Sequence, residues 1–288
     1  MEHTAEELKE LFGALVRAGL DYRVGAEFAD ETLRLASVLV PSEKIYADPE
    51  EGCEGADVAV SYGGDGTFLD CVRVFGRFGI PVLGINSGRL GFLANVPKED
   101  MEQAFADLRY HRYEKEERSL ILAEGDFPGQ PEYPYAFNEF SIQRGGTSMI
   151  SVEAYINGEM VATYWGDGVL FSTPAGSTAY SLSVGGPVVA PGCECFLLSP
   201  IAPHNLTMRP VVIPDTSTAT FRVSTRDEYA FATLDNSHFE IPDGATFRVS
   251  KAEKPVFLVK LQNISFYDTL RNKMLWGIDK RGGGGHSE

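Results

Sequence analysis

Two glycine-rich segments constrain this sequence more than any other feature, and the first of them is Gly63–Thr67. It reads Gly-Gly-Asp-Gly-Thr and directly follows an apolar run over 56–62. Glycine adopts positive φ freely and has no Cβ to block a ligand. The pattern predicts a strand that ends in a turn, and then a helix over 67–78 whose first N–H groups face a bound phosphate. The candidate phosphate-binding residues are Gly63, Gly64, Gly66 and Thr67.

Asp65 is the unusual member of this turn. A carboxylate next to a phosphate site is repulsive unless it holds a metal ion or takes up a proton. The alternative is a plain turn in which Asp65 caps the following helix. No Gly-Lys-Ser/Thr follows, so the segment is not a Walker A loop, and it is not a Gly-x-Gly-x-x-Gly fingerprint either.

The second glycine-rich segment is Asp167–Ser183, which is closed by Gly185-Gly186-Pro187. We predict a strand that leads into a turn dense in hydroxyl groups and small side chains. The stretch 173–178, Thr-Pro-Ala-Gly-Ser-Thr, is unlike a core strand. Its hydroxyl and N–H donors suit a ligand with many acceptor atoms.

Two shorter segments carry further polar groups. Gly84–Leu93 follows a buried strand predicted over 81–85, and ligands of open parallel sheets bind beyond the carboxyl ends of the strands. This segment is therefore either a second wall of the same cleft or an ordinary connecting loop. Asn138 and Glu139 lie in a predicted strand over 137–143, where an amide can pair with a base edge and a carboxylate can accept from ribose hydroxyls. The alternative is a solvated strand end.

Charge and composition exclude several partner classes. The 288 residues carry a formal net charge of −16, whereas nucleic acids and anionic membranes attract basic surfaces. We therefore expect no nucleic acid and no membrane as partner. No stretch approaches the roughly 18 apolar residues of a membrane span, and the acidic N-terminus lacks the features of a signal peptide. These patterns predict a cytoplasmic protein.

The cysteines and histidines give no sign of a metal site. Cys193 and Cys195 form a lone Cys-x-Cys pair, and neither they nor the five histidines show metal-ligand spacing. We expect Cys53, Cys71, Cys193 and Cys195 to be plain reduced thiols, and metal-binding residues stay unassigned.

The order of predicted elements indicates two domains. Helices over 5–20, 67–78 and 97–110, the last beginning at Pro97, alternate with short strands in the first third, which predicts a mostly parallel sheet. From about Arg112 short strands dominate, and Asn157-Gly158 is a strong hairpin signal. The predicted fold is an α/β N-terminal domain plus a mostly β C-terminal domain. We expect the first domain over 1–111, the mostly β domain over 112–262, and a segment over 263–288 whose helix packs back on the first domain and whose glycine-rich tail is disordered.

Taken together, these segments resemble the NAD kinases. The Gly-Gly-Asp-Gly-Thr turn, Gly84–Leu93, Asn138-Glu139, Asp167–Ser183 and Ser199–Pro210 occur in the order seen in that family. The resemblance runs from about residue 56 to about 278. The pentapeptide alone is shared with phosphofructokinases and diacylglycerol-type lipid kinases, whereas Asp167–Ser183 is far more specific.

The resemblance implies domain roles, an activity and a set of site residues. It implies an α/β Rossmann-like N-terminal domain over 1–111 that is the nucleotide (ATP)-binding domain, and a mostly β C-terminal domain over 112–262 that is the NAD-binding domain. Family members transfer the γ-phosphate of ATP to the 2′-hydroxyl of the adenosine ribose of NAD, giving NADP, and assemble as homodimers or homotetramers whose NAD sites are built partly by a neighbouring subunit. By motif match, Asp65 takes the catalytic position. The positions that match cofactor-binding residues are Asp65, Gly66, Asn138, Glu139, Asp167, Ala175, Thr178, Ala179, Tyr180, Ser181, Leu182, Ser183, Ala202 and Asn236.

The match also has departures, and it leaves alternatives open. Ala175 stands where the family often has Thr, Asp235-Asn236-Ser237 replaces the usual Asp-Gly-Gln, and no initial strand is evident ahead of the helix over 5–20. In the mechanism that the resemblance implies, a divalent cation, Mg²⁺, bridges the ATP phosphates, and Asp65 either accepts the hydroxyl proton or helps to hold the ion. The competing functions are a diacylglycerol-type lipid kinase and a catalytically silent NAD(H)-binding regulator.

Overall fold

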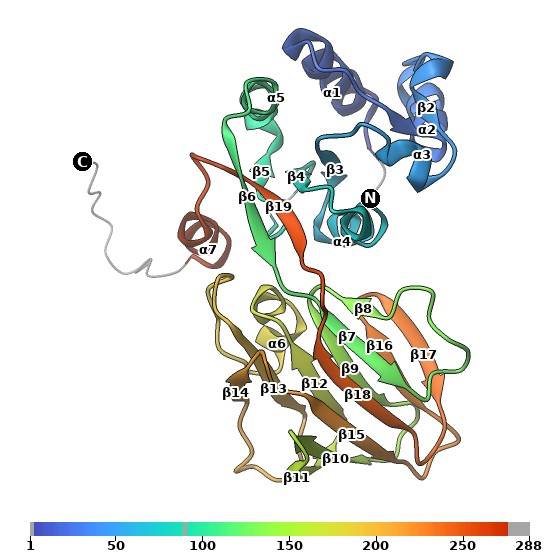
Figure 1. The fold of residues 1–288 in the computed structure, drawn as a ribbon, viewed down its shortest axis with the longest axis vertical. Helices are drawn as coiled ribbons and strands as arrows, with labels where there is room; N and C mark the ends of the chain where they lie inside the picture. The colour runs from blue at the N-terminus through green and yellow to red at the C-terminus, as the bar shows by residue number, and fades with distance from the viewer. Residues whose placement is uncertain (1–2, 89–90, 276–288) are drawn as a thin grey trace, which may run out of the picture. The chain divides into compact units, whose positions relative to one another are not determined.

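The computed structural model describes residues 3–88 and 91–275, which form two compact units. Unit 1 comprises the described residues of Met1–Lys115 and of Val259–Glu288, and unit 2 is Glu116–Leu258. The chain therefore enters unit 2 within strand β6 (Tyr113–Arg118) and leaves it within strand β19 (Val256–Leu261) (Figure 1).

Unit 1 is an α/β unit that begins with a well-capped helix. Helix α1 (Ala5–Ala18) starts at a capping box, in which the Thr4 hydroxyl accepts from the Glu7 N–H and the Glu7 carboxylate accepts from the Thr4 N–H. It ends at Gly19, whose φ of 63° is the left-handed conformation that glycine adopts without strain. The other helical segments of unit 1 are α2 (Ala26–Ala36), η1 (Ser42–Lys44), α3 (Pro49–Cys53), α4 (Asp65–Phe75), η2 (Gly76–Phe78), η3 (Lys98–Asp100), α5 (Met101–Arg109) and α7 (Phe266–Met274).

The main sheet of unit 1 has the strand order β3-β4-β19-β6, with β5 (Val96–Pro97) paired to β4. Strands β3 (Ala59–Gly63), β4 (Val82–Asn86) and β5 pair in parallel, as do the short strands β1 (Val24–Gly25) and β2 (Ile45–Tyr46). Side chains from α1, α5 and the sheet share one core, in which Ala14, Phe105 and Ile85 are fully buried. This arrangement confirms the predicted Rossmann-like domain.

Unit 2 consists of two six-stranded sheets with the orders β11-β10-β15-β18-β7-β8 and β14-β13-β12-β9-β16-β17. Both sheets contribute to one core rich in phenylalanine, including Phe140, Phe171 and Phe221. Its elements are β7 (Ile121–Gly125), β8 (Tyr135–Ala136), β9 (Glu139–Arg144), β10 (Ile150–Ile156), β11 (Glu159–Gly166), β12 (Gly168–Ser172), η4 (Ala175–Thr178), α6 (Tyr180–Ser183), β13 (Cys195–Ile201), β14 (Val211–Pro214), β15 (Ala219–Ser224), β16 (Ala230–Leu234), β17 (Ser237–Ile241) and β18 (Thr246–Lys251).

The local predictions can be compared with these elements. The hairpin at Asn157-Gly158 is confirmed, because both residues have positive φ (52° and 84°) and join β10 to β11. The helix predicted to begin at Pro97 is wrong at its start: Pro97 ends β5, and the α-helix begins at Met101 after a turn of 3₁₀ helix. The predicted glycine-rich tail lies outside the described residues.

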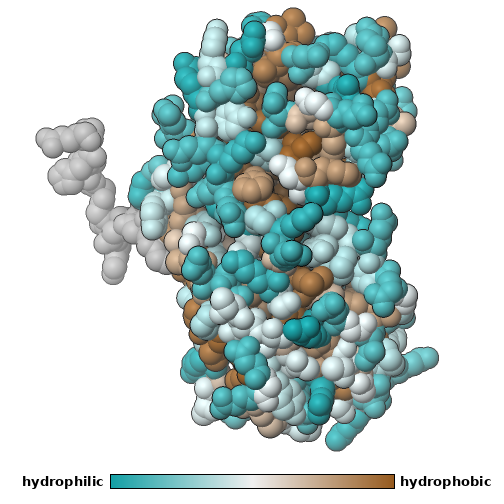
Figure 2. Space-filling view, in the orientation of Figure 1, coloured by the Kyte–Doolittle hydropathy of each residue, from teal (hydrophilic) through white to brown (hydrophobic). Residues whose placement is uncertain are grey.

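Hydrophilic side chains cover most of the face drawn in Figure 2, and the exposed apolar groups lie between them in small clusters. Over residues 3–88 and 91–275, no helix is both long and apolar enough to cross a membrane. The four cysteines are free, as predicted.

Candidate functional site

The Gly63–Thr67 segment forms a tight turn at the carboxyl end of β3. Helix α4 begins at Asp65, two residues earlier than predicted, with Gly64 as its N-cap. A Cβ on Gly63 would lie 2.6 Å from the Thr67 hydroxyl oxygen, so only glycine fits there without movement. A Cβ on Gly64 or Gly66 would meet no described atom within 4 Å, so the backbone is open at these two positions.

The second loop, after β4, adjoins this turn. Strands β3 and β4 are paired in register from Ala59 and Val82 to Gly63 and Asn86, so both loops leave the same edge of the sheet. A backbone hydrogen bond of 3.3 Å from the Ser87 N–H to the Gly63 carbonyl links them. The start of the second loop, at Ser87, therefore contacts the glycine turn, as its placement after a neighbouring strand predicts.

Asp65 is the group that joins the two loops. Its carboxylate accepts three backbone N–H groups, from Phe92 at 3.0 Å, Leu93 at 3.1 Å and Ala94 at 3.0 Å. A Cβ on Gly91 would lie 1.9 Å from Asp65 Oδ1, so the close approach requires glycine. Asp65 does not cap α4, because the N-cap position carries no side-chain hydrogen bond. The interpretation of this residue as a plain helix cap is therefore wrong.

One cation reaches the same carboxylate. The Lys273 Nζ atom, on the last turn of α7, lies 3.5 Å from Asp65 Oδ2 and 4.7 Å from the centre of the Phe92 ring. No sequence pattern predicts this contact, because the two residues are 208 positions apart.

In unit 2, a single carboxylate positions Asn138 and Glu139. Strand β9 begins at Glu139, two residues later than predicted, so Asn138 lies in the bend before the strand and not on it. Asp235 accepts N–H groups from Phe137 at 2.7 Å, Asn138 at 2.8 Å and Glu139 at 3.0 Å. Asp235 itself has a φ of 48°, a left-handed conformation in the turn between β16 and β17. Burial raises the pKa of Asp235 to about 6, and the three backbone hydrogen bonds oppose that rise. Asp235 belongs to the segment that replaces Asp-Gly-Gln, but the motif match assigned a cofactor contact only to the neighbouring Asn236, which lies exposed in the same turn.

Buried polar atoms without a hydrogen-bond partner gather around this strand. Among the described residues, neither Asn138 Oδ1 nor Glu139 Oε2 has a partner, and the same holds for Ser181 Oγ on α6. Burial, with the nearby Asp235 carboxylate, raises the pKa of Glu139 to about 8. Buried polar atoms are normally paired, and leaving one unpaired costs about 1–3 kcal/mol. Such atoms are typical of a site whose ligand supplies the missing partners.

The hydroxyl-rich segment is folded against the same strand. The Thr173 hydroxyl donates to the Phe137 carbonyl at 2.7 Å, and a Cβ on Gly176 would lie 2.2 Å from the Asn138 carbonyl oxygen. The Thr178 hydroxyl donates to the Ala175 carbonyl at 3.2 Å. The hydroxyls of Thr173 and Thr178 are therefore taken by backbone carbonyls, whereas the buried Ser181 hydroxyl has no partner among the described residues.

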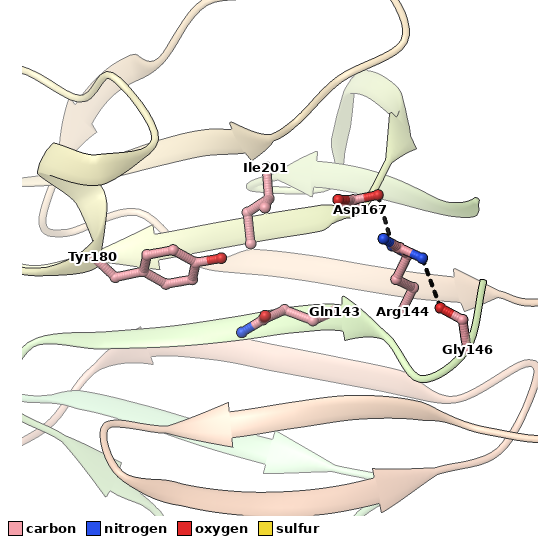
Figure 3. A pocket seen from close by; sticks show the side chains of 6 residues that line it. All are labelled: Gln143, Arg144, Gly146, Asp167, Tyr180 and Ile201. Carbon is pink, nitrogen blue, oxygen red and sulfur yellow. Dashed lines mark hydrogen bonds and ion pairs between the residues drawn. The ribbon is translucent and has the colours of Figure 1, made fainter. Parts of the chain in front are cut away.

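A cavity of about 320 Å³ opens beside this segment in unit 2 (Figure 3). Tyr180 points into the space between Gln143 and Ile201. Asp167 lies in the bend between β11 and β12 rather than on a strand, and its Oδ1 atom is 2.7 Å from Arg144 Nε. The ring of Tyr180 is desolvated, and Asp167 and Glu139 lie near it, so its pKa is raised.

The structure thus groups most of the predicted acceptor-side residues within unit 2. Asn138, Glu139, Asp167 and the segment 175–183 surround strands β9 and β12, and Ala202 directly follows β13 with a φ of 42°. Ser183 and Asn236 are exposed. Sequence reasoning missed Gln143 and Arg144, which follow Glu139 on β9 and carried no signal beyond strand alternation.

Comparison with known proteins identifies the family. Residues 18–113 match the model of the ATP-NAD kinase N-terminal domain, and residues 137–261 match that of the C-terminal domain. The chain is 40% identical over 272 residues to an NAD kinase of Bacteroides fragilis, covering 94% of this chain and 93% of that protein. It is 37% identical over 275 residues to an NAD kinase of Cytophaga hutchinsonii, covering 95% and 94%.

Two solved structures share the fold. A yeast NADH kinase complexed with NADH aligns with a TM-score of 0.82 at 23% identity, covering 95% of this chain and 85% of that one. An NAD kinase from Archaeoglobus fulgidus in complex with ATP aligns with a TM-score of 0.67 at 29% identity, covering 86% and 94%.

Proposed function

The chain belongs to the NAD kinase family, and from this premise we propose that it transfers the γ-phosphate of ATP to the 2′-hydroxyl of the adenosine ribose of NAD, giving NADP. The enzyme is a phosphotransferase with an alcohol group as acceptor. The observation that carries the proposal is Asp65, whose carboxylate is fixed by three backbone N–H groups at the glycine turn. Nothing in the comparisons supports a diacylglycerol-type lipid kinase or a silent regulator.

Asp65 orients the 2′-hydroxyl and accepts its proton late in the transfer. Phosphoryl transfer depends on positioning and charge stabilisation more than on covalent chemistry, so a carboxylate held rigidly by backbone donors suits this role. The glycine turn approaches the phosphates of ATP through the backbone of Gly63, Gly64, Gly66 and Thr67.

NAD is bound in unit 2 by the polar atoms that lack partners. Glu139 accepts from ribose hydroxyls, and the Asn138 amide and the Ser181 hydroxyl pair with the adenosine. Asp167 and Tyr180 line the cavity beside them. Because these groups stay unpaired with a wrong substrate, they discriminate against acceptors that cannot match them.

A divalent cation, Mg²⁺, accompanies ATP and neutralises charge on its phosphates. The described residues contain no group of three or more His, Cys, Asp or Glu side chains that could hold the ion. Asp65 does not fit as a direct ligand in this conformation, because its oxygens face N–H donors and an ammonium group. The phosphates of ATP would therefore hold the Mg²⁺ ion.

The enzyme acts in the cytoplasm as a homodimer or homotetramer. Strands β11 and β14 lie at the edges of their sheets, and both expose apolar side chains: Met160, Val161 and Trp165 on the first, Val211 and Val212 on the second. Such surface is suited to a symmetric contact between copies of the chain. Light scattering that finds an active monomer at every working concentration would refute the assembly.

An assay of ADP release over a panel of acceptors tests the proposed function. ADP should form with NAD present and not with diacylglycerol in vesicles or without an acceptor, and NADP should appear in equal amount. Asp65→Asn should lower turnover by about 10²–10⁴-fold, the usual contribution of a general acid or base, while NAD still binds. Absence of ADP release with every acceptor would refute the activity, and near-normal turnover of the variant would refute the role of Asp65.

A further inference from the structure

The phosphate side of the proposed site carries no cation within its own glycine turn. Gly63–Thr67 contains no lysine or arginine, unlike loops in which a lysine directly contacts the transferred phosphate. Charge spreads over the oxygens of the phosphoryl group during transfer, so a fixed positive charge nearby is worth a large rate factor. Because the turn itself lacks such a charge, the charge has to come from another part of unit 1 that lies against Asp65.

Lys273 meets this requirement. Its ammonium is 3.5 Å from Asp65 Oδ2 and lies over the Phe92 ring, whose own backbone N–H donates to the same Oδ2 atom. The side chain is 34% exposed, and Asp65 is its sole hydrogen-bond partner within the part of the chain that the structure describes. An ammonium has three donors, so it can bind an anion with the two that are left.

The contact with Asp65 is easily exchanged. A carboxylate offers about four lone-pair sites, and three short backbone hydrogen bonds occupy three of those on Asp65. The ammonium takes the fourth at a longer distance, and partly exposed ion pairs of this kind hold their partners only weakly. A triphosphate, with more charge than one carboxylate, competes effectively for the same ammonium.

We propose that Lys273 is a catalytic residue that moves from Asp65 onto the γ-phosphate when ATP binds. The exchange has two effects: it places a positive charge on the transferring group, and it frees the Oδ2 lone pair of Asp65. The bond from the ribose O2′ to the γ-phosphorus then forms while the bond from that phosphorus to the β,γ-bridging oxygen breaks. ADP leaves with the electron pair, and the hydroxyl proton passes to Asp65 Oδ2. This inference rests on the proposed kinase activity.

The test compares Lys273→Met, Lys273→Arg and the control Arg271→Met. Arg271 lies on the same helix and pairs with Asp268, so its replacement removes the same charge without touching Asp65. Steady-state ADP release gives kcat and the KM for ATP, calorimetry gives the affinity for inorganic triphosphate and for NAD, and melting temperature reports the fold.

Loss of one preorganised electrostatic donor typically costs about 10²–10³-fold in kcat, and we expect Lys273→Met to fall in this range. Its triphosphate affinity should fall about tenfold or more, while its NAD affinity and melting temperature stay near those of the wild type. Lys273→Arg should recover part of the rate, and Arg271→Met should stay within about twofold.

Each other outcome is informative. A normal rate and normal triphosphate affinity in Lys273→Met would overturn the inference, and so would equal losses in Lys273→Met and Arg271→Met. If Lys273→Met lowered both the melting temperature and the affinity for NAD, Lys273 would have a structural role, and this result would also overturn the inference. If the wild type releases no ADP with any acceptor, the proposed function fails instead, and the triphosphate titration alone still decides whether Lys273 binds phosphate.

Discussion

Replacing Glu139 by Gln should change how the stability of the protein depends on pH. Glu139 Oε2 is buried without a hydrogen-bond partner, and the Asp235 carboxylate lies near it. Both effects disfavour the ionised form and raise the pKa of Glu139 from 4.5 to about 8. The native state therefore holds a proton on Glu139 over a pH range in which the unfolded chain has already lost it.

The sign and size of the effect follow from this difference. The native pKa lies above the unfolded value, so the stability that the proton provides is complete below pH 4.5 and is lost as the pH rises through 8. Each pKa unit corresponds to about 1.4 kcal/mol, so the loss amounts to a few kcal/mol at most. Glutamine has the same shape and does not titrate. The free energy of unfolding of Glu139→Gln should therefore increase by that amount, relative to the wild type, between pH 5 and pH 8.5.

Urea unfolding at a series of pH values measures the difference. Glu124→Gln is the matched control, because Glu124 is an exposed glutamate on β7 of the same unit. We expect the free energy of unfolding of Glu139→Gln, relative to that of the wild type, to increase as the pH rises. The free energy of unfolding of Glu124→Gln should stay parallel to that of the wild type at every pH. Parallel curves for Glu139→Gln would refute the reasoning, because they would mean that Glu139 ionises equally in both states.

Three further variants test the site. Glu139→Ala should weaken NAD binding by up to about tenfold, the value of one hydrogen bond to an uncharged carboxyl group, and leave ATP binding unchanged; equal losses for both substrates in titrations would mean that the residue supports only the fold. Asp235→Asn keeps one acceptor oxygen for three N–H donors, so it should misplace Glu139 and weaken NAD binding by a similar factor; calorimetry showing wild-type affinity would contradict this positioning role. Gly91→Ala places a Cβ 1.9 Å from Asp65 Oδ1, so kcat should fall by at least tenfold while the affinity for NAD holds, and a normal kcat would show that the loop adapts.

Local features were predictable from the sequence where one short segment decides the structure. The helix over 5–20 has an apolar stripe and a glycine stop, and the hairpin at Asn157-Gly158 needs only two residues with positive φ. Helix α2 was missed because its buried face consists of Ala29, Thr32 and Ala36, which are too small or too polar to form a visible apolar stripe. Strand β17 was not predicted, because it has only five residues after a turn and shows too little alternation of apolar and polar side chains to indicate a strand.

The site was predictable in its residue types but not in its contacts. The motifs pointed to Asp65, Asn138 and Glu139, and the structure surrounds each with other polar groups. Their partners lie far along the chain: Asp65 contacts residues 27–29 positions away, and Asp235 contacts a strand about a hundred positions before it. Such pairs depend on the path of the chain between them, which periodicity and turn signals do not specify.

The strand order of unit 1 has a consequence for the newly made chain. Strand β19 lies between β4 and β6 in the sheet, yet the whole of unit 2, Glu116–Leu258, is synthesised before β19 is complete. Until residue 261 has left the ribosome, β4 and β6 lack the strand that separates them, and their edges stay unpaired. Synthesis at about 5–20 residues per second makes that wait many seconds long, and it leaves unit 1 exposed to mispairing until its last strand arrives.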